Sequence, residues 1–243
     1  MSNVERIIVF GATGQTGLKI LKIALEEGLE VTAFVRTPSK IPENIRNRLY
    51  KVVKGEVKDK EIIEDAIQGH DAVLSALGGK LKIGASDKIM STGVANIIGG
   101  MKKHNVRNLI VVSGGLQLPS HAIPKFFLSF FVGELADHSA VIKLLENASD
   151  DIDWIAVAPP FIKDSDEIEP DYMVAINAMP GVSNVTSAEI ADFMIKIITD
   201  KNKQETYKHA KVGISSRAST SFKAPIAILL LALAAGSIMY YTQ

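Results

Sequence analysis

Short apolar runs rich in β-branched residues alternate with longer amphipathic segments along most of this 243-residue chain. The short runs are typical of buried strands, and the longer segments have the spacing of helices. Strands are predicted at Arg6–Phe10, Glu30–Val35, Lys51–Lys54, Ala72–Ser75, Asn108–Val112 and Asp153–Ala158, with a last strand near Tyr207–Val212. Helices are predicted up to about Glu27, around Glu61–Ile67, from about Ser86 to His104, up to about Asn147, and over Ala188–Thr199. This alternation predicts an α/β fold with a doubly wound parallel sheet.

Composition narrows the possible partners. Hydrophobic residues make up 47% of the chain and charged residues 22%, which suits one domain with a sizeable core. The formal net charge is zero, so no basic excess points to nucleic acid. The chain has no cysteine, which excludes disulfides and thiolate chemistry, and its five histidines show no metal-ligand spacing, so no metal site is expected.

The C-terminal segment differs from the rest of the chain. We divide the sequence into a domain over residues 1–214, a polar linker over 215–224, and an apolar stretch over 225–241. The apolar stretch would span about 26 Å as a helix, close to the hydrocarbon thickness of a bilayer. It is predicted to be a transmembrane tail anchor, and a buried core or docking helix is the alternative.

Charge around this stretch predicts its orientation. Arg217 and Lys223 precede it and no basic residue follows, which keeps the N-terminal domain in the cytosol. No signal peptide is expected at the N-terminus, because Arg6–Phe10 runs directly into a glycine turn. The expected location is a single-pass membrane position facing the cytosol. The endoplasmic reticulum is favoured over the mitochondrial outer membrane.

A glycine-rich turn follows the first predicted strand and opens the first helix. Gly11, Gly14 and Gly17 have the spacing GxxGxxG, a variant of the dinucleotide-binding fingerprint. The first glycine permits a tight turn, the second lets the backbone approach a pyrophosphate, and the third allows close packing of the helix on the strand. A strand on one side and a helix on the other supply the context that the motif requires, so a Rossmann-type NAD(P)-binding domain is predicted.

The end of the second predicted strand indicates the type of cofactor. NAD-specific sites place an acid there to hold the ribose 2′-hydroxyl. This chain has Arg36 at that position, followed by Thr37, Ser39 and Lys40. A guanidinium suits a 2′-phosphate, so NADPH is the expected cofactor.

The runs IVFGATGQTGL (Ile8–Leu18), Val31–Arg36, Val52–Val57, Asp71–Gly78, Met101–Val106 and Ala156–Ile162 resemble the biliverdin-IXβ reductase and NADPH-dependent flavin reductase family. This family belongs to the atypical short-chain dehydrogenases, which have NmrA-like relatives. The resemblance extends in order from about Val4 to Val212. It implies a reductase that transfers hydride from NADPH to a flavin, biliverdin-like or quinone-like conjugated acceptor.

The resemblance also implies roles for individual residues. Arg36 would hold the 2′-phosphate, and Ser113 would lie near the nicotinamide. The other assignments are Thr13, Gln15 and Thr16 at the pyrophosphate, Glu56 and Val57 at the adenine, Leu77, Gly78 and Gly79 at the nicotinamide ribose, and Pro159, Pro160, Phe161 and Ile162 at the carboxamide. The family's reductase has a histidine where this chain has Phe161.

The residue that would donate a proton in the reaction is a separate question. Most short-chain dehydrogenases use a Tyr-xxx-Lys pair on the helix after the fifth strand, but no tyrosine lies between Gly114 and Asp153. Ser113 and His138 are the catalytic candidates, and His138 falls where the family also has a histidine. A structural role for His138 is the alternative.

Two further segments and two further functions stay open. The acidic segment Asp164–Asp171 is expected to be a solvated loop, with a lid over the site as the alternative. The phenylalanines at 126, 127, 130 and 131 are expected to pack in the core. A non-catalytic NADP(H)-sensing protein that acts through protein partners at a membrane is the alternative function. An assembly factor that keeps the fold only as a scaffold is the third.

Overall fold

The computed structural model describes residues 4–78, 88–114, 118, 132–181 and 183–217. Its main sheet has eight strands in the order β3-β2-β1-β4-β5-β6-β10-β8, and a second sheet pairs β7 with β9. The strands are β1 (Arg6–Phe10), β2 (Glu30–Val35), β3 (Lys51–Lys54), β4 (Ala72–Ser75), β5 (Asn108–Val112), β6 (Asp153–Ala158), β7 (Phe161–Lys163), β8 (Met173–Ile176), β9 (Asn184–Thr186) and β10 (Ala210–Ser215).

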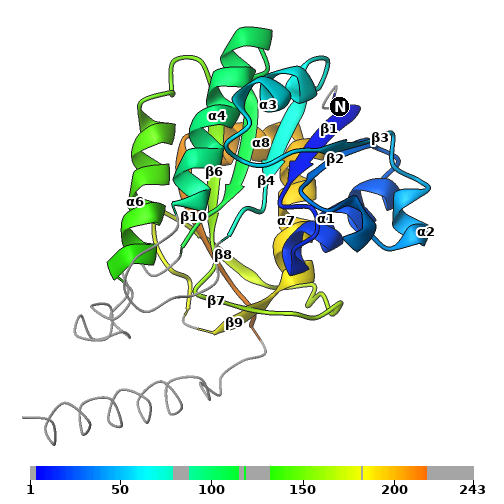
Figure 1. The fold of residues 1–243 in the computed structure, drawn as a ribbon. Helices are drawn as coiled ribbons and strands as arrows, with labels where there is room; N and C mark the ends of the chain where they lie inside the picture. Colours follow the sequence, from blue (N-terminus) through cyan, green and yellow to red (C-terminus); the bar gives the residue numbers. More distant parts are fainter. Residues whose placement is uncertain (1–3, 79–87, 115–117, 119–131, 182, 218–243) are drawn as a thin grey trace, which may run out of the picture.

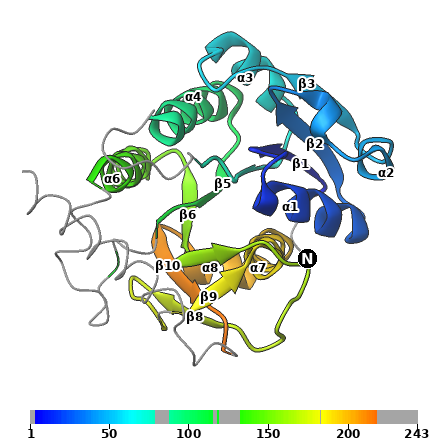
Figure 2. The same cartoon turned by 60° about the horizontal axis from the view of Figure 1, so that its bottom comes forward.

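Helices cover both faces of the main sheet, as Figures 1 and 2 show. The helices are α1 (Gln15–Glu26), the 3₁₀ helix η1 (Pro38–Lys40), α2 (Glu43–Arg46), α3 (Lys60–Ile67), α4 (Ile89–His104), α6 (Val132–Glu146), α7 (Ser187–Thr199) and α8 (Lys201–Tyr207). Helices α1 and α7 pack together on one face, and α3, α4 and α6 pack on the other. The predicted α/β Rossmann-type architecture, with one domain and a parallel sheet, is confirmed.

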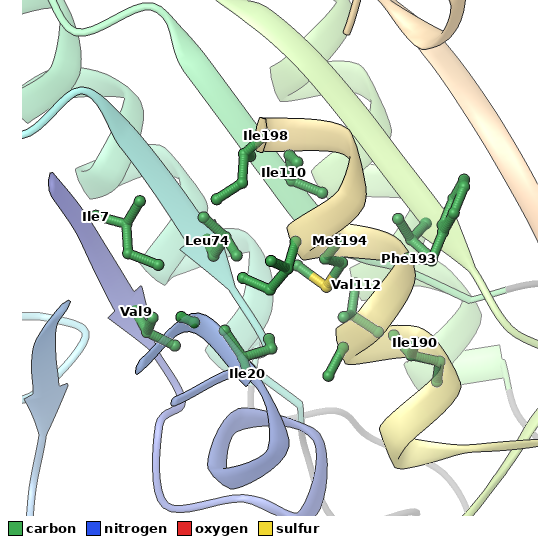
Figure 3. Close-up of a cluster of buried hydrophobic side chains, with 14 of the residues drawn as sticks. Ile7, Val9, Ile20, Leu74, Ile110, Val112, Ile190, Phe193, Met194 and Ile198 are labelled. Atoms are coloured by element: carbon green, nitrogen blue, oxygen red, sulfur yellow. The ribbon is translucent and has the colours of Figure 1, made fainter. Parts of the chain in front are cut away.

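Successive side chains along each strand point to opposite faces of the sheet, so the hydrophobic core has two layers. In β1, Ile7 and Val9 point toward α1 and α7, whereas Ile8 and Phe10 point toward α3 and α4. Both sets are fully buried, which explains why the strand is apolar at successive positions. Figure 3 shows the first layer, in which Met194 and Ile190 of α7 lie against the sheet.

The chain beyond β6 differs most from the prediction. Tyr207, predicted to open the last strand, is instead the last residue of α8; a turn follows, and β10 begins only at Ala210. Asp200 caps α8 by accepting hydrogen bonds from the N–H groups of Asn202 and Lys203. Strand β8 pairs with β10 in the antiparallel direction, so the sheet carries one antiparallel strand at its edge.

The folded domain extends through Ser216, two residues past the boundary predicted at 214. The predicted anchor at 225–241, most of the predicted linker, and the phenylalanines at 126, 127, 130 and 131 lie outside the described residues. Among the helices that the structure does describe, none combines the length and apolar character needed to cross a bilayer.

Candidate functional site

The candidate site lies at the carboxyl ends of the parallel strands. Strands β1 and β4 are neighbours in the sheet. From β1 the chain continues through β2 to β3 on one side, and from β4 it continues through β5 to β6 on the other side. In open α/β sheets, such a reversal leaves a crevice between the loops that follow the two strands. The glycine turn follows β1, and residues 76–78 follow β4, so both segments border this crevice.

The turn after β1 accepts only glycine at two of its positions. Gly11 has a φ of +71°, and a Cβ added there would lie 2.5 Å from the carbonyl oxygen of Ala76. A Cβ on Gly17 would lie 2.2 Å from the carbonyl oxygen of Gly11. The backbone N–H of Gly14 closes the turn by donating to that same oxygen at 3.0 Å. The motif therefore brings β1, α1 and the loop after β4 into direct contact.

Helix α1 begins at this turn with no side-chain cap. Gly14 is the N-cap residue and lacks a side chain that could accept from the first amides of the helix. Gly14 and Gln15 are exposed, Thr13 is half-buried, and Thr16 is buried under the turn. Free amide groups and the positive end of the helix dipole make this position suitable for an anion such as a phosphate.

Arg36 stands beside the turn, just after β2. Strands β1 and β2 pair with Phe10 opposite Phe34, so the residues that follow them lie at the same end of the sheet. Arg36 is exposed, and among the contacts of the described residues it makes no hydrogen bond or ion pair. Its guanidinium is therefore available to a second anionic group near the turn.

The segments after β3 and β4 meet on helix α4. A Cβ on Gly93 would lie 2.5 Å from Cδ1 of Leu77 and 3.4 Å from Cβ of Val57, so both side chains pack against this glycine. The Asn96 side chain donates to the carbonyl oxygen of Val57 at 2.7 Å and fixes that loop. Glu56 is exposed and forms an ion pair with Lys58.

The loop after β4 leaves room beside this contact. Gly78 is exposed, and a Cβ added there would meet no atom within 4 Å. Gly79 lies outside the described residues. The structure thus brings Val57 and Leu77 together, with open space at Gly78 next to them.

The end of β5 meets helix α6. The backbone N–H of Ser113 donates to the carbonyl oxygen of Val157 at 2.7 Å, and the Ser113 side chain is buried. A Cβ on Gly114 would lie 3.0 Å from Cδ2 of His138, so the imidazole lies flat against this glycine. The two catalytic candidates are therefore close neighbours.

His138 is held as a neutral side chain. Burial lowers its pKa below the ordinary value, and the nearby Asp137 only partly opposes this shift. Its Nδ1 is buried and has no hydrogen-bond partner. At neutral pH the ring is uncharged, so this geometry favours a packing or orienting role over proton donation from an imidazolium.

The residues after β6 form one wall at the same end of the sheet. Pro159 and Pro160 are buried, and they end β6 because proline has no N–H for the ladder. Phe161 and Ile162 are half-buried in β7, where they pair with Asn184 and Val185 of β9. The second sheet was not predicted, because three-residue strands leave little periodicity to read.

The acidic segment is exposed, as a solvated loop predicts, yet it is attached to α1. Asp166 lies 2.8 Å from Nζ of Lys19, and Lys22 approaches the same carboxylate. The backbone N–H of Glu169 donates to Glu189 of α7. The segment therefore lies along the outer side of the helix that follows the glycine turn.

Asp137 was missed by the sequence analysis. It is buried, and its carboxylate accepts from the backbone N–H groups of Met90 and Ser91 at 3.2 and 3.1 Å, capping the start of α4. Asn96 was missed as well. The only sequence signal was an acid directly before His138 and an amide on a predicted helix, and neither indicates which backbone group it will meet.

Comparison with known proteins agrees with this geometry. The profile of a family described as NAD(P)H-binding matches residues 11–201. A Rossmann-fold NAD(P)-binding family protein from Shigella flexneri is 20% identical, with a TM-score of 0.69, and the match covers 91% of this chain and 98% of that one.

Two further structures have similar scores. A wide-type short-chain dehydrogenase/reductase from Veillonella parvula, in complex with NADP, is 16% identical, with a TM-score of 0.67 and coverage of 90% and 97%. A protein from Streptococcus pneumoniae, provisionally named an NADH-flavin reductase, is 19% identical, with a TM-score of 0.66 and coverage of 88% and 100%. At these identities the likeness establishes the fold.

Proposed function

This chain belongs to the NAD(P)H-binding family, and we propose that it is an NADPH-dependent reductase that passes hydride to a flat, conjugated acceptor. The observation that carries this proposal is the open carboxyl end of the sheet. There an uncapped helix start and an exposed arginine stand side by side without partners of their own among the described residues.

These groups match the anionic parts of NADPH. The amides at the start of α1, beside Thr13, Gln15 and Thr16, suit the pyrophosphate, because Gly14 lets the backbone approach closely. Arg36 suits the 2′-phosphate, since a guanidinium can donate two parallel hydrogen bonds to it. Val57 and Glu56 would border the adenine.

The other loops at the carboxyl end of the sheet suit the nicotinamide half of the cofactor. Leu77 and Gly78 would run beside its ribose, and Pro159, Pro160 and Ile162 would hold the carboxamide end. When bound, the dihydronicotinamide supplies a hydride from its C4 atom. The chain's own contribution is to hold two flat rings in contact and to exclude water between them.

An alcohol dehydrogenase mechanism is disfavoured by the tyrosines. Tyr172 donates its hydroxyl to Asp192 at 2.9 Å, and its pKa is raised by burial and by that carboxylate. Tyr50 contacts Arg6 at the opposite end of the sheet. Conjugated acceptors suit this site because they are electron-poor and can take their proton from solvent.

The test is NADPH oxidation with FMN, riboflavin and dichlorophenolindophenol as acceptors. Turnover should survive Tyr→Phe at every tyrosine, and Ser113→Ala or Phe161→Ala should change it more. A tyrosine variant that folds normally but loses the hydride step would contradict the proposal.

A second function is favoured by the state of His138. A half-buried imidazole whose pKa is lowered by burial gives the site no ready acid, which also suits a protein that binds NADP(H) and signals to protein partners without turnover. The same assay separates the two functions, because a sensor binds NADPH tightly but oxidises it with none of the three acceptors.

We also propose that residues 225–241 anchor the protein in a membrane, with the domain in the cytosol and the endoplasmic reticulum as the favoured location. The support is the uncharged apolar sequence and the basic residues Arg217 and Lys223 before it. The full chain should stay with membranes after alkaline carbonate washing, and a chain ending at Arg217 should be soluble and still bind NADPH. If the full chain washes off, the anchor is wrong.

A further inference from the structure

The described part of the chain ends next to the candidate site. Strand β10 runs parallel to β6 with Gly213 opposite Ala158, and neighbouring strands lie about 5 Å apart. Ser215 therefore comes level with the residues that follow β6, which include Phe161. Figure 1 shows β10, in orange, reaching the same end of the molecule as β7 and β9.

Buried hydrogen bonds hold this exit in place. The Ser216 hydroxyl donates to the carboxylate of Glu189 at 2.6 Å, and Glu189 is fully buried. Ser183 donates its hydroxyl to the carbonyl oxygen of Ser216, also at 2.6 Å. Arg217 adds an ion pair with Asp171. Ser216 and Arg217, the last described residues, are thus attached to α7 and to the acidic segment.

The distance from this exit to the proposed anchor is short. Seven residues, 218–224, separate Arg217 from Pro225, and they span at most about 25 Å when fully extended. A domain of this size is about 44 Å across. The tether is too short to pass around the domain, so the amino end of the sheet cannot be turned toward the bilayer.

We infer that the carboxyl end of the sheet faces the membrane surface and that the acceptor is a neutral, lipid-soluble quinone taken from the bilayer. This inference rests on the proposed reductase function and on the proposed anchor. It gives the site a substrate class and a direction of access.

Charge at this end favours a neutral acceptor over an anionic one. The cations nearest the acidic segment are Lys19, Lys22, Lys163 and Arg217, and each is already paired with one of its carboxylates. Arg36 is assigned to the 2′-phosphate. Within the described residues the charges of this segment are thus largely balanced, and half-buried Phe161 and Ile162 offer apolar contact to a neutral ring.

The reaction balances without any further co-reactant. The quinone takes up a hydride from NADPH, which carries two electrons, and one proton from water. It leaves as the hydroquinone, and the oxidised cofactor leaves as NADP⁺. The hydroquinone is also lipid-soluble and returns to the bilayer, so substrate and product share one route.

The orientation is tested by energy transfer in full-length protein. Because the chain has no cysteine, a single introduced cysteine takes a fluorophore at one position only. Glu167→Cys labels the exposed acidic segment, and Gln68→Cys labels an exposed position at the amino end of the sheet. In phosphatidylcholine vesicles with acceptor dye on the headgroups, transfer from position 167 should be severalfold higher than from position 68. Equal or reversed transfer overturns the inference.

A variant with a longer segment between the domain and the proposed anchor provides the control, and it also tests which acceptor is used. Thirty Gly and Ser residues inserted after Arg217 should abolish the difference in transfer between the two labels. The insertion should also lower NADPH oxidation by a long-chain benzoquinone in the vesicles severalfold, while oxidation by soluble dichlorophenolindophenol stays unchanged. Activity with the dye but not with the quinone overturns the substrate assignment. Inactivity with both acceptors refutes the reductase function, and the transfer experiment still decides the orientation.

Discussion

The two ends of the sheet differ in how they satisfy their polar groups. At the amino end, the carboxylate of Asp71 accepts from the backbone N–H groups of Glu5 and Arg6 at 2.9 and 2.8 Å. Asp153 accepts from Arg107 and lies 2.9 Å from Nζ of Lys208. Side chains of this chain therefore close the amino end.

At the carboxyl end, several polar groups lack such partners, whereas at the amino end the buried Nε2 of His104, at the end of α4, is the one such side-chain atom among the described residues. The start of α1 has no side-chain cap, and the Nδ1 atom of His138 is buried without a hydrogen bond. Unsatisfied groups cost stability, so a fold keeps them where a ligand supplies the missing partner. The uncapped start of α1 and the exposed Arg36 after β2 distinguish the carboxyl end as the candidate binding end, and the following experiments test this assignment.

The largest effect is expected from Gly11→Ala, with Gly28→Ala as its matched control. Both glycines have positive φ, +71° and +80°, so the conformational strain of an alanine is similar, at about 1–2 kcal/mol. Gly28 lies at the amino end and has no atom within 4 Å of an added Cβ, whereas at Gly11 the new methyl would clash with Ala76.

Urea unfolding and NADPH titration measure the difference. Gly11→Ala should lose about 3 kcal/mol or more of unfolding free energy and should no longer bind NADPH. Gly28→Ala should lower the unfolding free energy only by the conformational strain of the alanine, and it should bind NADPH normally. Equal effects of the two substitutions would mean that the contact between the turn and Ala76 is unimportant.

The next effect concerns arginines at opposite ends. Arg36→Ala should weaken NADPH binding by about 1.5–3 kcal/mol and NADH binding much less, because only NADPH carries the 2′-phosphate. Arg48→Ala is the control, since Arg48 donates to the carbonyl oxygen of Leu25 at the amino end. Isothermal titration measures both affinities. Equal affinity of the unmodified protein for NADPH and NADH would refute this cofactor assignment.

A smaller effect on stability is expected from Asp153→Asn at the amino end of the sheet. Burial opposes ionisation, but hydrogen bonds from Arg107 and Lys208 outweigh it and lower the pKa of Asp153. The stability that this lowered pKa provides is present above the unfolded-state pKa of about 3.9 and is lost as pH falls through the folded-state value. The variant should lose about 1–2 kcal/mol at pH 7 and show a flatter acid dependence, with unchanged NADPH affinity. Weakened NADPH binding would contradict the separation of the two ends.

The smallest effect concerns His70, also at the amino end. Burial lowers the pKa of His70, and its Nε2 lies 2.8 Å from the hydroxyl oxygen of Thr32. Because the folded state favours the neutral ring, its stability contribution is present above about pH 6.5 and is lost as pH falls below that value. His70→Gln should flatten the loss of unfolding free energy between pH 7 and 5. An unchanged slope would show that other groups cause it.

The core strands could be predicted because their signal is local. Six strands, β1 to β6, have the predicted bounds. Five of them are largely apolar and buried, and only the edge strand β3, with the sequence KVVK, is partly exposed. The glycine turn could be predicted as well, because the positive φ of Gly11 and the close contact of Gly17 with Gly11 are local features of the motif. Helix α8 was missed because its polar sequence has no apolar face to read.

The missing parts of the candidate site depend on distant contacts. Asp137 caps α4 by accepting from the N–H of Met90, 47 residues earlier in the chain, and Val57 and Leu77 both pack against Gly93. The strands β7 and β9 exist only because residues 161–163 and 184–186 pair. No pattern within one segment contains this information.

The sequence by itself determined the α/β alternation, the glycine turn with an arginine after the next strand, and the apolar character of residues 225–241. These properties follow from residue type and short spacing, which act before the chain folds. Only the tertiary structure decided that Gly11 meets Ala76, that His138 lies on Gly114 as a neutral ring, and that Glu189 holds the exit of the chain beside the site. Burial and hydrogen-bond partners arise when distant segments come together, so they are properties of the fold.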